Sequence, residues 1–214
     1  MTEQSLRSKL VKWISEVADK RLPKEDSARF KAFAEQVIHV HPDESLLRWP
    51  KEDNFGAVYG LYSFVDKRAG DKPLLKVFNP GLENDGWVSK HSLIYFCQKD
   101  MPFLVESLRM ALNRLQLQIH LFESNVVWVR RDADGKLLEV TDARREGSTP
   151  ESLGYIQIDA SSDTEYLDSI HDRLMDAFLN VDTVVSDFAP MIERVNQCID
   201  ELSSIRDVDP EEIE

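Results

Sequence analysis

Apolar residues spaced three and four positions apart predict helices over the first 70 residues of the chain. A first helix is predicted from an N-cap at Ser5 to just before Pro23, and a second within PKEDSARFKAFAEQVIHV. The sequence HPDESLLRWPKEDNFGAVYGLYSFVDKRAG predicts a short helical turn and then a longer helix that ends at Gly70. Gly56 and Gly60 lie four apart on that helix. They indicate close packing and not a phosphate loop, because no strand precedes them.

Beyond Gly70 the pattern changes to short strands with turn residues between them. Asp134 and Gly135 are the predicted turn of a long hairpin, and a polar loop is predicted over residues 142–151. The predicted strands are residues 74–78, residues 92–98, the two arms of QIHLFESNVVWVRRDADGKLLEV, and LGYIQIDA.

Two amphipathic helices alternate with these strands. Asp100 is the predicted N-cap of the first, with Pro102 in its first turn, and Asp163 is the predicted N-cap of the second. Helical periodicity then continues with a bend predicted at Pro190, and the final DVDPEEIE resembles the start of another helix. The predicted inward stripes are Leu104, Leu108, Ala111 and Leu115; Tyr166, Ile170, Leu174, Ala177 and Val181; and Phe188, Ile192, Val195, Ile199 and Leu202.

The order of elements predicts an α+β fold with an antiparallel sheet and two helices on one of its faces. We expect an N-terminal helical segment over residues 1–72 and a βαββα sandwich of ferredoxin-like type over residues 73–181. A C-terminal helix over residues 182–214 would begin a linker to domains that lie downstream.

Composition and charge exclude several classes of function. The net charge is −13, and residues 163–214 hold 15 acidic and 3 basic residues. The chain therefore lacks the basic footprint of a nucleic-acid-binding protein. It has neither an apolar run long enough for a membrane span nor a signal peptide, so we expect no membrane association. Cys97 and Cys198 fit reduced core residues, which favours the cytoplasm.

Candidate chemistry is sparse. No dinucleotide or phosphate-binding glycine motif and no zinc motif is present. His39 and His41 favour a helix-end pair at the surface over a metal site, and His91 and His120 favour partly buried structural roles. An anion site and an ordinary charged hairpin tip are the two alternatives for one basic cluster. This cluster is Arg130, Arg131, Lys136, Arg144 and Arg145.

The stretch DMPFLVESL, where a strand meets a helix, resembles the ligand-binding corner of ACT domains, regulatory modules that often sense amino acids. Asp100, Pro102, Leu104 and Val105 match the usual Asp-x-Pro-Gly-Leu-Leu pattern, whereas Phe103 replaces its glycine. We expect the large Phe103 ring to pack into an interface. The candidate ligand-binding residues are Asp100, Met101, Phe103 and Leu104.

A longer stretch is similar to the N-terminal region of the large bacterial NAD-specific glutamate dehydrogenases. Its markers include VFNP at residues 77–80, GW at 86–87, MPFLV at 101–105, RM at 109–110, LNR at 112–114 and the strand at 125–130. The resemblance implies that the chain is the N-terminal part of a longer enzyme whose NAD-binding and catalytic residues lie downstream. It assigns no catalytic residue, cofactor or metal to this chain.

Two functions follow as expectations. The first is a non-catalytic regulatory or assembly domain of an NAD-dependent glutamate dehydrogenase, with downstream domains of the same polypeptide and further copies in a homo-oligomer as partners, and with an amino acid as a candidate effector. The second is an interaction scaffold that binds no small molecule. A free-standing enzyme is the third class, and no constellation of residues supports it.

Overall fold

The computed structural model describes residues 3–39, 51–70 and 72–204. It begins with helices α1 (Glu3–Arg21), α2 (Lys24–His39) and α4 (Lys51–Val65). Helices were predicted in all three places. Since α1 already includes residue 3, the predicted N-cap at Ser5 is wrong. The predicted short helical turn before α4 and the predicted helix start within DVDPEEIE lie outside the described residues.

Helix α4 ends at Val65 and not at Gly70 as predicted, because residues 66–68 pair with a β-hairpin instead. The amide of Arg68 donates to the carbonyl of Gly135 at 3.0 Å, and the amide of Leu137 donates to the carbonyl of Asp66 at 2.7 Å. The carbonyl of Val65 accepts a hydrogen bond from the guanidinium of Arg131 at 2.9 Å. These contacts satisfy backbone groups that continuing the helix would have paired internally.

One antiparallel sheet forms the centre of the molecule, with strand order β1-β2-β5-β3-β4. Strand β5 begins inside the predicted polar loop, because its first four residues pair with residues 126–129 of β3. The end of that loop was therefore predicted wrongly, while the five strands themselves are confirmed. The strands are β1 (Leu74–Phe78), β2 (Ser92–Lys99), β3 (Ile119–Arg131), β4 (Leu137–Thr141) and β5 (Thr149–Ile158).

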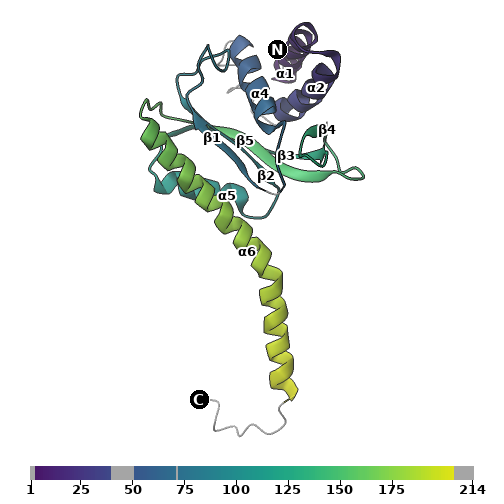
Figure 1. The fold of residues 1–214 in the computed structure, drawn as a ribbon, viewed down its shortest axis with the longest axis vertical. Helices are drawn as coiled ribbons and strands as arrows, with labels where there is room; N and C mark the ends of the chain where they lie inside the picture. Colours follow the sequence, from purple (N-terminus) through teal and green to yellow (C-terminus); the bar gives the residue numbers. More distant parts are fainter. Residues whose placement is uncertain (1–2, 40–50, 71, 205–214) are drawn as a thin grey trace.

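Helices cover both faces of the sheet (Figure 1). Side chains alternate along β2, so Leu93, Tyr95 and Cys97 join the core formed with α1, α2 and α4. Ile94 and Phe96 join a second core, formed with α5 (Leu104–Arg114) and α6 (Thr164–Ser204). The predicted α+β class is confirmed, with α5 and α6 together on one face. The domain boundaries after residues 72 and 181 stay predictions.

Two glycines of α4 allow the helix to approach the sheet side of the core. A β-carbon added at Gly56 would lie 2.4 Å from the ring of Trp87, and one added at Gly60 would lie 3.1 Å from the hydroxyl of Tyr95. Both glycines therefore permit close packing of α4, against the side chains of a loop residue and a strand residue. Tyr95 also donates a hydrogen bond to the carbonyl of Ala57 at 3.0 Å.

The inward faces of α5 and α6 differ slightly from the predicted stripes. Leu112 is fully buried in α5, whereas Ala111 and Leu115 are half-buried. In α6 the amide of Tyr166 donates to the carboxylate of Asp163 at 3.1 Å, which confirms the predicted N-cap. The Tyr166 side chain is 41% exposed, however, so its place in the core was predicted wrongly. The buried residues of α6 are Leu167, Ile170, Leu174, Phe178 and Val181.

Candidate functional site

The candidate corner lies between the end of β2 and the start of α5. The amide of Asp100 donates to the carbonyl of Pro150 at 3.0 Å, and its carboxylate accepts a hydrogen bond from the Ser152 hydroxyl. Asp100 is thus tied to β5. The predicted capping role of Asp100 is wrong, because the N-cap of α5 is Phe103, which makes no side-chain capping bond.

Phe103 adopts the left-handed backbone conformation, with φ 68° and ψ 1°. This conformation costs an L-residue roughly 1–2 kcal/mol, whereas glycine adopts it freely. The glycine usual at this position in the ACT pattern therefore has a conformational reason. The carbonyl of Phe103 accepts from the amide of Ser107 at 2.9 Å, which begins the hydrogen bonding of α5.

The interior of the corner is polar. Gln98 is 2% exposed, and its side-chain amide donates to the sulfur of Met101 at 3.4 Å. Its Oε1 atom has no hydrogen-bond partner within the described part of the chain. Of the predicted ligand-binding residues, Leu104 is buried in the core and offers only its backbone, while Phe103 is 65% exposed. The corner thus gathers the four predicted residues, but their side chains point to different places.

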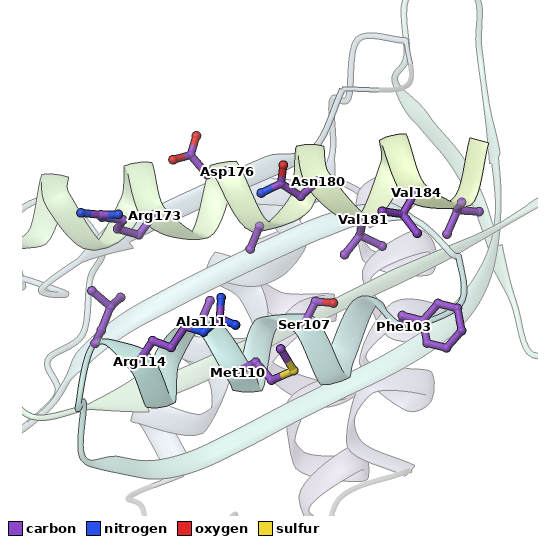
Figure 2. Close-up of a pocket in the computed structure, with 13 residues that line it drawn as sticks. Phe103, Ser107, Met110, Ala111, Arg114, Arg173, Asp176, Asn180, Val181 and Val184 are labelled. Carbon is purple, nitrogen blue, oxygen red and sulfur yellow. The ribbon is translucent and has the colours of Figure 1, made fainter. Parts of the chain in front are cut away.

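A groove of about 590 Å³ lies beside the corner, between α5 and α6. Phe103 stands at one end near Val184, and Arg114 and Arg173 stand at the other end (Figure 2). The groove was missed by sequence reasoning, because its depth depends on the separation of two helices. Its lining is Phe103, Ser107, Met110, Ala111, Arg114, Leu115, Arg173, Asp176, Ala177, Asn180, Val181, Val184 and Val185.

The groove suits binding rather than bond chemistry. Its lining is mainly apolar, and its charged groups, Arg114, Arg173 and Asp176, lie toward one end. A groove with an apolar floor and charges at its margin is typical of sites for amphipathic segments.

One residue of the predicted basic cluster at the hairpin, Arg131, binds a buried carboxylate instead. Glu151 is fully buried and accepts two hydrogen bonds from Arg131, both at 2.8 Å. Arg68 is 5% exposed and donates to the same carboxylate at 3.0 Å. The expectation of a solvated tip is therefore wrong for Arg131. Sequence reasoning also missed Arg68 and Glu151, since no local pattern marks a pair 83 residues apart.

The protonation of this cluster follows from its charges. Burial alone would raise the pKa of Glu151, but the hydrogen bonds and charge of Arg131 and the charge of Arg68 outweigh it and lower that pKa. Burial, together with the negative charge of Glu151, raises the pKa of the Cys97 thiol well above its usual value. The thiol therefore stays protonated and donates to Glu151 at 3.3 Å. Arg130 and Arg145 pair instead with Glu139, at 3.2 and 3.0 Å.

His91 is half-buried as predicted, whereas His120 is exposed, so its predicted partial burial is wrong. The rings of His91 and His120 lie tilted to each other with centroids 4.1 Å apart, and His120 Nε2 lies 2.6 Å from the carboxylate of Asp159. The side chain of His39 and the whole of His41 lie outside the described residues. Across residues 3–39, 51–70 and 72–204, no group of three or more potential metal ligands is close enough to hold an ion. No helix in those ranges is long and apolar enough to cross a membrane.

Comparisons with known proteins agree on one kind of relative. The profile of a family described as "Glutamate dehydrogenase, ACT1 domain" matches residues 33–174. An NAD-specific glutamate dehydrogenase of Halomonas elongata is 33% identical over 215 residues, which cover 98% of this chain and 13% of the relative. One of Pseudomonas aeruginosa is 31% identical over 185 residues, covering 86% of this chain and 11% of the relative. The chain thus spans about an eighth of their length, and no solved structure matches it significantly.

Proposed function

The chain belongs to the glutamate dehydrogenase ACT1 domain family, and we propose that it is a non-catalytic regulatory and assembly domain of an NAD-dependent glutamate dehydrogenase. The observation that supports this proposal is the family match over residues 33–174, which takes in the whole sheet, α5 and the first part of α6. The parent enzyme would oxidise L-glutamate to 2-oxoglutarate and ammonia and reduce NAD. The NAD-binding and hydride-transfer residues belong, in this proposal, to other parts of that enzyme.

The regulatory part of the proposal places an amino-acid effector at the corner between β2 and α5. Leu104 would offer its backbone amide to the effector carboxylate, and the free Oε1 of Gln98 would accept a hydrogen bond from its ammonium group. Asp100, fixed by Ser152, would hold the turn. Met101 covers Gln98, so an effector would have to displace the Met101 side chain.

The assembly part of the proposal draws on exposed apolar surface. The groove between α5 and α6 and the C-terminal half of α6 present apolar side chains that other domains or further copies of the chain would cover. Downstream domains of the same polypeptide and a homo-oligomer are the proposed partners. We also propose a cytoplasmic location, where the protonated thiol of Cys97 would stay reduced.

A pure scaffold without a small-molecule ligand is the second candidate, and Phe103 favours it. Its ring replaces the usual glycine and is 65% exposed, so it stands beside the corner where an effector would approach. An exposed phenyl ring held in an unfavourable backbone conformation is more readily explained by contact with a partner than by ligand entry.

Thermal unfolding of the 214-residue chain with glutamate, aspartate or arginine separates the two candidates. A bound effector at 100 times its dissociation constant adds about 2.7 kcal/mol to the free energy of unfolding. The regulatory role predicts stabilisation by one amino acid, lost in Asp100→Ala and kept in the exposed control Asp142→Ala. Stability unchanged by all three would support the scaffold.

A further inference from the structure

The C-terminal half of α6 carries an apolar seam that repeats every seven residues. Two sets of positions, each spaced by seven, lie on one side of the helix, and a third set flanks them. The first set is Val181, Phe188, Val195 and Leu202; the second is Val184, Met191 and Cys198; the third is Val185, Ile192 and Ile199. We call the residues from Val184 to Leu202 in these sets the α6 seam.

Most of the seam is exposed, and of its residues Val185 packs against the core shared by α5 and α6. Phe188, Ile192 and Ile199 are 63%, 47% and 53% exposed, although their sequence pattern is that of a buried helix face. The reason is positional, since α6 runs well past the edge of the sheet, and α5 accompanies only its first half (Figure 1). The cover that α5 and the sheet give to Leu174 and Phe178 ends near Val181.

The groove between α5 and α6 continues the seam toward the sheet. Val184 and Val185 belong to both features, because they line the groove and also hold seam positions. Figure 2 shows Val184 at the groove. Pro190 lies on the opposite side of the helix from the seam, where its missing amide leaves the packing face intact. Groove and seam therefore form one apolar surface. Residues 184–202 alone span roughly 28 Å at 1.5 Å per residue, enough for a partner helix of about five turns.

Charge selects among the helices that could cover this surface. Helix α6 contains nine Asp and Glu residues against two arginines, and one of those, Arg194, lies 3.7 Å from Glu201. A second copy of α6 laid along the seam would bring two strongly acidic helices together, which like-charge repulsion disfavours. A helix with Lys or Arg beside its apolar face would meet Asp182, Asp187 and Asp200 with opposite charge.

We propose that the α6 seam binds one amphipathic helix whose apolar residues repeat every 3.5 positions and whose flanks are basic. This inference rests on the assembly role proposed above and gives that role a partner chemistry. The seam residues supply the apolar contact, and the acidic groups of α6 exclude acidic helices and steer basic ones.

Two synthetic 28-residue helices of the same Leu and Ile heptad pattern, one with Lys and the other with Glu at the flanking positions, test the proposal. Fluorescence anisotropy with the 214-residue chain should show the Lys peptide binding at least ~10-fold more tightly than the Glu peptide. Raising the salt concentration should narrow that difference. Equal affinities for the two peptides, or no binding of either, would overturn the proposal.

Variants locate the binding. Phe188→Ser combined with Ile192→Ser should abolish binding of the Lys peptide, while Leu179→Ser, an exposed apolar residue on the other side of α6, should leave it unchanged. Circular dichroism checks that each variant keeps its helix. Light scattering should report a monomer, and a dimer lost in the double variant would instead assign the seam to a second copy. The absence of peptide binding would not affect the regulatory role, because that role is tested separately by the stabilisation that an amino acid gives when it binds at the β2–α5 corner.

Discussion

Arg131 of β3 holds Glu151 of β5 by two hydrogen bonds of 2.8 Å, and Arg68 approaches the same fully buried carboxylate from the segment that follows α4. The contact therefore joins the N-terminal helices to the sheet. A buried carboxylate with two guanidinium partners is stable only as a set, because removal of one member leaves the others charged and desolvated.

We predict that Glu151→Gln lowers the free energy of unfolding by about 3–5 kcal/mol, because the buried Arg68 and the partly buried Arg131 lose their counter-charge. Urea titration measures the loss. Glu139→Gln, which removes the partly exposed partner of Arg130 and Arg145, should cost under about 1 kcal/mol. Equal losses of unfolding free energy in the two variants would show that the buried ion pairs of Glu151 stabilise the fold no more than the ion pairs of Glu139 do.

The same carboxylate predicts a pH dependence. The pKa of Glu151 is lower in the folded chain than its usual value of 4.5, so the folded state favours the ionised form. Its contribution to stability is full above that value and is lost as the pH falls through the lower folded pKa. Wild type should lose stability between pH 5 and more acid conditions more steeply than Glu151→Gln. If the free energy of unfolding of the two chains fell in parallel with pH, the role assigned to Glu151 would be contradicted.

Leu108 and Arg109 are neighbours in sequence with opposite roles in α5. Leu108 is 1% exposed, so Leu108→Ala should cost about 2–5 kcal/mol through lost burial and a cavity. Arg109 is exposed and places its guanidinium 4.0 Å from the centre of the Phe122 ring, so Arg109→Ala should cost only about 0.5–1 kcal/mol. Urea titration compares the free energy of unfolding of the two variants. Similar losses would show that Leu108 does not face the core while Arg109 faces solvent.

Phe103 tests the backbone argument at the corner. Because its φ is positive, Phe103→Gly should be more stable than Phe103→Ala by about 1 kcal/mol, although glycine is the more flexible residue in the unfolded chain. Thermal unfolding of the two variants gives the difference. A more stable alanine variant would mean that residue 103 leaves the left-handed conformation in solution.

Gly56 tests the approach of α4 to the core. Gly56→Ala would place a methyl group 2.4 Å from the rigid ring of Trp87, so it should destabilise the chain by about 1–3 kcal/mol despite the better helix propensity of alanine. Gly81 has no atom within 4 Å of an added β-carbon and no positive φ, and Gly81→Ala is the matched control. A stabilised Gly56→Ala chain would show that α4 lies farther from Trp87.

Elements with a strong local period could be predicted from the sequence. Strand β1 was predicted at its observed bounds, and β2 extends one residue further, because runs of apolar residues between turns identify buried strands. Asp163 was found as the N-cap of α6, since its bond to Tyr166 spans only three residues. These features depend on neighbours in the chain, which the sequence displays directly.

Features that depend on distant partners could not be predicted. Asp100 has the sequence of a helix cap. Its carboxylate instead accepts a hydrogen bond from Ser152, and its amide donates to the carbonyl of Pro150, both on the adjacent strand. The sequence predicts Glu151 in a polar loop, because its two arginine partners lie far from it in the sequence and no local pattern marks the contact. The groove likewise appears only when α5 and α6 are set side by side. The candidate corner was found through its resemblance to the ACT-domain pattern. The left-handed backbone of Phe103 explains why that pattern usually has glycine at this position.

We propose that this chain is a domain of a glutamate dehydrogenase that does not itself carry out the reaction. The most direct measurement is NADH formation by the purified 214-residue chain in the presence of saturating L-glutamate and NAD, compared with a blank that lacks glutamate. We predict the same rate in both. Glutamate-dependent NADH formation that co-purifies with the chain would contradict the proposed non-catalytic role.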